Sequence, residues 1–319
     1  MFLLRNVFAI ISMLMILGSC SSPMQTEQRI QSVGMLLNGN ISDHIWNEKG
    51  YQGLVSLGEK YGMDVYYKEN VATEKEIIEA IEEFSNQGVN FIFGHSSFYG
   101  KHFTDVAENY SHIQFVYFNG SYVAKNVTSF TFDTYAAGYF AGMLSGKMTA
   151  VNKVGIIATN EWQPEIEGFF EGVKNVNPKA EIELAFLNDW NEVQTAQGIY
   201  QQMKSTGVDV FYPIGDAFSE EIIKQAKRDE VYAIGYRTNQ AELAEHTVLT
   251  STVHHVEKLY EYAVEHVNDR NLAGQLKSFD FQDGVISLAP FNDQVPHSYQ
   301  YEMNQAMEHY TNTGLLPER

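Results

Sequence analysis

Three tryptophans are the side chains of this sequence best suited to hold a small planar molecule. Trp46 comes shortly after the first predicted strand, while Trp162 and Trp190 follow predicted strands that end near residues 158 and 186. Open parallel sheets bind ligands beyond the carboxyl ends of their strands, and stacking a base on an aromatic ring contributes roughly 1–3 kcal/mol. A tryptophan in such a loop can equally pack the loop onto its own domain, so each of the three is a candidate.

Polar residues and glycines stand in similar positions, directly after predicted strands. Glycine permits close approach to the backbone, and short polar side chains offer hydrogen bonds, although both also make ordinary turns. Asp43 is expected to cap the helix that carries Trp46, because an aspartate there accepts amide hydrogens of the first turn. The candidates of this kind are Asn38, Asp43, His95, Ser96, Asn119, Gly215, Asp216 and Arg237.

Cys20 is the only cysteine, and it ends the only strongly apolar run of the chain. Arg5 and the apolar segment 7–17 have the order of a secretory signal, and the segment is shorter than the roughly 20 residues that a membrane-spanning helix needs. Leu17-Gly-Ser-Cys20 resembles the lipobox of bacterial lipoproteins. We therefore expect a signal peptide at 1–19, lipidation of Cys20 and anchoring on the extracytoplasmic face of the cell membrane. The alternatives are an ordinary secretory signal and an uncleaved anchor.

The net charge argues against nucleic-acid binding. The 319-residue chain has a formal charge of −19, which becomes −20 when Arg5 leaves with the signal peptide. Such a surface repels nucleic acid, and no cluster of lysines and arginines makes a local exception. With Cys20 lipidated, the mature chain has no thiol for a disulfide or a thiolate metal site.

The sequence contains none of the common motifs of catalytic and cofactor sites. It has no glycine-rich phosphate loop, no GxSxG segment and no HExxH segment. His254 and His255 are adjacent, so on a helix they diverge by about 100° and make a poor metal-binding pair. No pair of carboxylates stands out as a general acid and base. We therefore expect no enzymatic activity, no catalytic residues, no cofactor and no metal site.

The elements that must position these residues alternate as short β-branched or aromatic runs and amphipathic helical stretches. This alternation predicts parallel, doubly wound α/β sheets. The expected strands are 32–37, 64–67, 90–93, 114–118, 127–132, 153–158, 181–186, 209–212, 231–235 and 248–253, and the expected helices are 43–61, 74–87, 98–110, 135–148, 164–175, 193–205, 219–228, 254–268 and 297–311.

These strands are too many for one comfortable open sheet, and the pattern restarts near residue 153. Two Rossmann-like lobes that face each other across a cleft fit this pattern. We expect a hinge of three strands, with crossings near 130–133, 253 and 281–285. The predicted division is a tether at 20–29, an N-terminal lobe of 30–130 plus 254–283, and a C-terminal lobe of 131–253 plus 284–319.

A likeness to one protein family extends over nearly the whole chain after the tether. It is carried by Val33-Gly-Met-Leu-Leu-Asn-Gly-Asn-Ile-Ser-Asp43-His-Ile-Trp46-Asn47, Ala137-Gly-Tyr-Phe-Ala-Gly142, Ala233-Ile-Gly235 and Val248-Leu-Thr-Ser251. These segments resemble the basic membrane protein (Bmp) family of substrate-binding lipoproteins, which includes purine nucleoside receptors. With Trp162-Gln-Pro-Glu165 added, the likeness is greatest to the Med-type lipoproteins, which are positive regulators of competence gene expression.

The resemblance implies a type I periplasmic-binding fold whose lobes close on a nucleoside that is delivered to an ABC transporter. It also implies that Trp46 and Trp190 sandwich the base, with Asn47 beside the first ring. The expected partners are therefore a small nucleoside-like ligand and an ABC permease.

The positions that bind the sugar in nucleoside receptors differ in this chain. Arg237 stands where the family has an aspartate, His254 where it has a lysine, and Asn38 where the first loop usually has an aspartate. A guanidinium only donates hydrogen bonds, so it cannot replace a carboxylate that accepts two ribose hydroxyls. One hypothesis is that Arg237 and His254 favour an anionic group instead, such as a phosphate or carboxylate.

The sequence leaves two functions open. The first is solute binding for an ABC transporter. The second is a Med-like regulatory lipoprotein that has lost transport and activates competence gene expression indirectly, through a membrane signalling partner.

Overall fold

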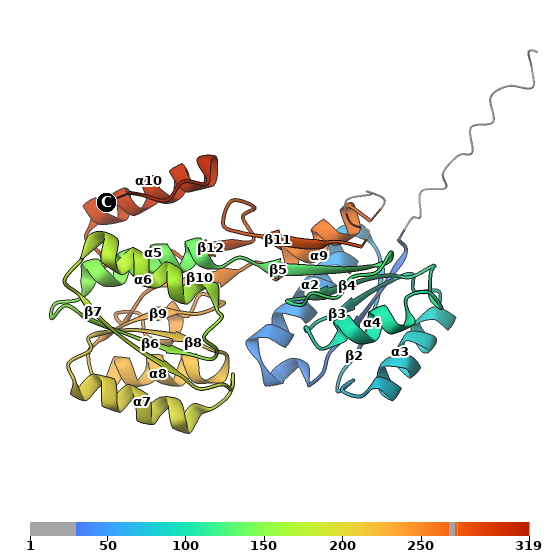
Figure 1. Ribbon diagram of the computed structural model, residues 1–319, viewed down its shortest axis with the longest axis horizontal. Coiled ribbons are helices and arrows are strands. Elements are labelled where there is room, and N and C mark those ends of the chain that lie inside the picture. Colours follow the sequence, from blue (N-terminus) through green and yellow to red (C-terminus); the bar gives the residue numbers. More distant parts are fainter. Residues whose placement is uncertain (1–29, 268–271, 273, 319) are drawn as a thin grey trace, which may run out of the picture.

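The computed structural model describes residues 30–267, 272 and 274–318, which form two α/β lobes side by side (Figure 1). The predicted signal peptide, the tether and Cys20 lie outside the described residues. Each lobe is built on one six-stranded sheet, and all but one of the strand pairs are parallel, so the predicted fold class is confirmed. Among the described residues, no helix combines the length and apolar character that crossing a membrane would require.

The sheet of the N-terminal lobe has the strand order β11-β5-β4-β3-β1-β2. All five residues of β1 are buried because helices cover both faces of the sheet, as a parallel sheet requires. Helices α2 and α9 pack on one face, and α3 and α4 on the other. The elements are β1 (Ser32–Leu36), α2 (Ile45–Tyr61), β2 (Asp64–Lys68), α3 (Glu74–Asn86), β3 (Phe91–Gly94), α4 (Tyr99–Val106), β4 (Gln114–Phe118), β5 (Val127–Phe132), α9 (Val256–Glu265) and β11 (Leu276–Phe279).

The sheet of the C-terminal lobe has the order β12-β10-β9-β8-β6-β7, in which only β12 runs antiparallel to its neighbour. Helices α5, α6 and α10 lie on one side of this lobe, and α7 and α8 on the other (Figure 1). The elements are α5 (Tyr135–Met148), β6 (Lys153–Ala158), α6 (Pro164–Val176), β7 (Glu181–Phe186), α7 (Val193–Ser205), β8 (Val210–Ile214), α8 (Ala217–Arg228), β9 (Tyr232–Gly235), β10 (Val248–His254), β12 (Ile286–Leu288) and α10 (His297–Thr313).

The chain crosses between the lobes from β5 to α5, from β10 to α9 and from β11 to β12. These crossings lie where the sequence predicts the hinge. The strands β11 and β12 themselves were not predicted, because runs of four and three residues are too short to show a periodicity. The residue limits of the two lobes stay a prediction.

Asp43 does not cap the helix that carries Trp46, and this prediction is wrong. Asp43 ends a short 3-10 helix, η1 (Ile41–Asp43). Its carboxylate accepts hydrogen bonds from the backbone and side-chain nitrogens of Asn40 at 2.8 and 2.9 Å. His44 is extended, with φ of −148°, and α2 begins only at Ile45, without a side-chain cap. The local bonding of Asp43 to Asn40 thus competes with helix capping, as short polar side chains often do.

Helices α5 and α6 lie in direct backbone contact and bring Thr134, at the start of α5, against Glu165 in the first turn of α6. A Cβ atom added to Gly138 of α5 would lie 2.1 Å from the carbonyl oxygen of Glu165, and one added to Gly172 of α6 would lie 1.9 Å from that of Tyr139. No side chain fits at either position without separating the helices. Pro164 occupies the first turn of α6, as predicted from its fixed φ.

We expect Gly172→Ala to lower the free energy of unfolding by about 1–3 kcal/mol, because the added methyl group forces the two helices apart. This loss exceeds the gain in helix propensity of about 1 kcal/mol. Gly198→Ala on α7 is the matched control, since nothing lies within 4 Å of its added Cβ, and it should be neutral or stabilising. Urea unfolding of both variants checks this, and equal stabilities would refute the close contact.

Candidate functional site

A cavity of about 210 Å³ opens between the lobes, lined by residues from both. The structure brings together six of the side chains predicted from the sequence, which are Trp46, Asn119, Trp162, Trp190, Arg237 and His254. The cavity is also lined by residues that were not predicted, namely Phe132, Thr134, Gln163, Pro164, Glu165 and Tyr236. Tyr236 directly follows β9, so the rule that ligands bind beyond the carboxyl ends of parallel strands could have identified it. Nothing in the sequence marks Glu165 as buried, because a glutamate in a first helical turn is normally exposed.

Trp46 is held in place by His95, which follows β3. The indole Nε1 donates a hydrogen bond to the carbonyl of His95 at 2.9 Å, and the two rings stack with centroids 4.3 Å apart. The Nε2 of His95 lies 2.7 Å from the carbonyl oxygen of Trp46 and must donate to it. The Nδ1 therefore accepts from the hydroxyl of Tyr260 at 3.0 Å. His95 is fully buried and supports the tryptophan from behind instead of facing the cavity.

Neither histidine of the site carries a charge at neutral pH. Burial lowers the pKa of His95 to about 3. Burial also lowers the pKa of His254 well below its usual range, and the nearby charge of Arg237 adds to that effect. The ring of His254 stacks on Phe132 with centroids 5.0 Å apart. His254 therefore presents a neutral ring to the cavity, which weakens the hypothesis that it helps to bind an anion.

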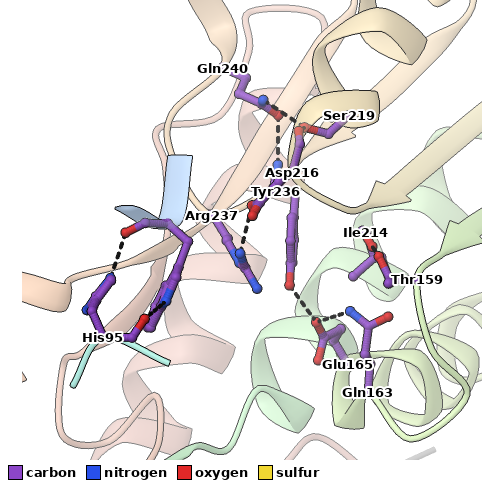
Figure 2. Close-up of polar contacts among 11 residues, drawn as sticks. His95, Thr159, Gln163, Glu165, Ile214, Asp216, Ser219, Tyr236, Arg237 and Gln240 are labelled. Carbon is purple, nitrogen blue, oxygen red and sulfur yellow. Dashed lines mark hydrogen bonds and ion pairs between the residues drawn. The ribbon is translucent and has the colours of Figure 1, made fainter. Parts of the chain in front are cut away.

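Arg237 is buried and already paired. Its Nη1 donates to Oδ1 of Asp216 at 2.7 Å, and the two side chains are only 10% and 6% exposed (Figure 2). The guanidinium carbon lies 4.5 Å from the ring centroid of Trp190 and 5.3 Å from that of Trp46. The charge that the sequence suggested for an anionic ligand is thus neutralised by an internal carboxylate. Asp216 itself lies behind the cavity as the partner of Arg237.

Glu165 places a carboxylate in the cavity wall, where its oxygens accept hydrogen bonds from three side chains, and Figure 2 shows two of them, Tyr236 and Gln163. The hydroxyl of Tyr236 donates to it at 3.2 Å and the amide of Gln163 at 3.4 Å, while the hydroxyl of Thr134 donates to the other oxygen. Buried polar groups are normally paired in this way. Among the described residues, no group of three or more histidine, aspartate, glutamate or cysteine side chains could hold a metal ion.

The loop that carries Arg237 is fixed by its own hydrogen bonds. The Oε1 of Gln240 accepts from the backbone nitrogen of Tyr236 at 2.9 Å, and its Nε2 donates to Ser219 at 3.1 Å (Figure 2). The backbone nitrogen of His254 donates to the carbonyl of Arg237 at 3.1 Å. These contacts hold Arg237 in a left-handed backbone conformation, with φ of 62°.

The remaining candidates do not line this cavity. Asn47 is buried, but its amide donates to the carbonyl of Asn40 at 2.9 Å. The hydroxyl of Ser96 accepts from the backbone nitrogen of Phe98 at 3.3 Å. The predicted residues away from the cavity lining are Asn38, Asp43, Asn47, Ser96 and Gly215. Their roles in binding stay predictions.

The chain matches one protein-family model over residues 30–318, and that family is described as ABC transporter substrate-binding protein PnrA-like (Bmp). Transcriptional activator protein med of Bacillus subtilis (strain 168) is 41% identical over 316 residues, which are 99% of each chain. A purine-binding protein of Brucella abortus (strain 2308) is 24% identical over 270 residues, which cover 82% of this chain and 75% of that protein.

Solved structures show the same architecture. The crystal structure of a transcriptional activator of the comK gene from Bacillus halodurans has a TM-score of 0.85 and 36% identity, and the match covers 90% of this chain and all of that one. More distant solute-binding proteins of known structure share the fold as well. The predicted type I periplasmic-binding fold is therefore confirmed.

The buried His95 predicts an acid-sensitive fold. An unfolded histidine binds a proton below its ordinary pKa of about 6.5, whereas folded His95 stays neutral down to a pKa of about 3. The unfolded state therefore binds more protons between these values, and stability falls as the pH falls through this window.

We expect His95→Gln to reduce this slope by up to about 1.4 kcal/mol per pH unit, measured by urea unfolding from pH 7 to pH 4.5. His246→Gln is the control, because His246 is exposed and should leave the slope unchanged. An identical slope in wild type and His95→Gln would contradict the assignment.

Proposed function

The chain belongs to the Bmp family of PnrA-like ABC transporter substrate-binding proteins, as its resemblance to that family predicted. We propose that it is a lipid-anchored binding protein whose lobes close on a small planar molecule. The observation that carries this proposal is the pair Trp46 and Trp190, which come from opposite lobes and line one cavity. Aromatic rings can stack on a planar ligand whichever polar groups that ligand carries. Cys20 would hold the protein at the extracytoplasmic face of the membrane.

The chemistry of the cavity favours a neutral, purine-like ligand over an anion. Asn119 offers an amide group that can both donate and accept hydrogen bonds, whereas the amide of Gln163 is already bonded to Asn160 and Glu165. Arg237 is paired with Asp216, Glu165 adds a further carboxylate, and the histidines are uncharged. An anionic ligand would have to compete with Asp216 for Arg237, the one arginine among the described residues that lines the cavity. The relative described as a purine-binding protein supports a purine base.

A regulatory role is the second candidate function. It is favoured by the 41% identity, over the full length, to a protein named as a transcriptional activator. The chain's charge of −19 opposes direct contact with nucleic acid, so regulation of competence genes would act through a membrane partner. In that case the cavity would sense a ligand without delivering it to a permease.

We expect adenine, adenosine or guanosine to raise the Tm of the purified protein, because a ligand that binds only the folded state stabilises it. Trp190→Ala should weaken binding by about 5- to 150-fold, the equivalent of one lost stacking contact. Tyr301→Ala is the control, since Tyr301 is an exposed aromatic on α10. Isothermal titration calorimetry measures the Kd values, and unchanged affinity in Trp190→Ala would move the site elsewhere.

Regulation through a membrane partner predicts that the anchor is required. In a host strain that lacks the gene, the wild-type chain should restore a competence-gene reporter and fractionate with membranes. Cys20→Ser should appear in the medium and fail to restore the reporter, while Ser21→Ala, the matched control, should behave as wild type. Full reporter activity with a released Cys20→Ser chain would argue against regulation at the membrane.

A further inference from the structure

The guanidinium of Arg237 takes up the stacking surface that a planar ligand would use. Its central carbon lies over the rings of both Trp190 and Trp46, at 4.5 and 5.3 Å from their centroids. A guanidinium is itself planar, delocalised and well suited to stack on aromatic rings. The side chain from one lobe therefore contacts the tryptophan of the other lobe as well as the tryptophan of its own.

The conformation of Arg237 costs free energy that its contacts with the tryptophans and Asp216 offset. Arg237 adopts φ of 62°, a left-handed conformation that is costly for a long side chain. Its Nε is buried and has no hydrogen-bond partner among the described residues, which also costs free energy. Pairing with Asp216 at 2.7 Å and stacking on the indole rings offset these costs. Unfavourable features of this kind are retained where the surrounding structure holds them, and they cluster at functional sites.

We propose that Arg237 is the specificity-determining residue of the cleft and acts as a built-in occupant of its stacking site. This inference rests on the proposed function, because it assumes that the tryptophans form the ligand site. A planar ligand must displace the guanidinium from the rings of Trp46 and Trp190. The wild-type protein consequently binds neutral purines weakly, since a neutral base competes with a cation that gains both a cation–π contact and an ion pair.

The decisive variant removes the guanidinium without straining the backbone at residue 237 and without leaving Asp216 as an unpaired buried charge. Arg237→Gly suits a positive φ, and Asp216→Asn is combined with it so that no unpaired buried carboxylate remains. We expect the double variant to bind adenosine with a Kd about tenfold or more below that of the wild type, measured by isothermal titration calorimetry. Arg228→Gly is the matched control, because Arg228 is an exposed arginine at the end of α8, and its Kd should equal that of the wild type.

A second variant covers the case in which glycine prevents folding. Asparagine also tolerates the left-handed region, so Arg237→Asn with Asp216→Asn should show the same gain in affinity, with circular dichroism reporting the folded state. If the wild type binds adenosine as tightly as these variants, the inference about Arg237 is wrong and the proposed binding function stands. If the folded variants and the wild type all fail to bind adenosine, adenine and guanosine, both the inference and the proposed function are wrong.

Discussion

The buried ion pair of Arg237 and Asp216 is the interaction on which the cleft depends. The guanidinium can lie against Trp46 and Trp190 because Asp216, 2.7 Å away, compensates its charge where both side chains are largely buried. Removing either partner alone would leave an uncompensated buried charge, which is strongly destabilising. The pair also sets the electrostatic character of the cavity. The charges of Arg237 and Asp216 offset each other, while the carboxylate of Glu165 lies in the cavity wall.

The two walls around this pair are held by different means. On the N-terminal side, Trp46 and His95 exchange hydrogen bonds at 2.9 and 2.7 Å, and their stacked rings rest on the buried core. On the C-terminal side, glycines with no room for a side chain let α5 and α6 pack closely. This contact places Thr134 within hydrogen-bond distance of Glu165. Both walls are therefore fixed by buried contacts, while the chain crosses between the lobes at three places.

The cleft of this family fold contains a side chain of the protein itself, which lies against the candidate stacking surface. The scaffold matches substrate-binding proteins, but the stacking surface of its cleft is covered by one of its own side chains. Under the proposal that a planar ligand must displace Arg237, the protein is suited to respond to high ligand concentrations, as in sensing, more than to capture scarce solutes. This property fits either a low-affinity binding protein or a regulator, and it is set by Arg237 and not by the fold.

The sequence by itself determined the longer strands, the helices, the two lobes and the position of Trp46 and Trp190 after strand ends, because these follow from local periodicity and the parallel-sheet rule. It did not predict β11 and β12, which are too short for a pattern, or the turn in which Asp43 bonds to Asn40. Only the tertiary structure decided that Arg237 pairs with Asp216, 21 residues away, and covers the two tryptophans. A side chain's partners and its burial depend on contacts between segments that lie far apart in the chain, and no local pattern encodes them.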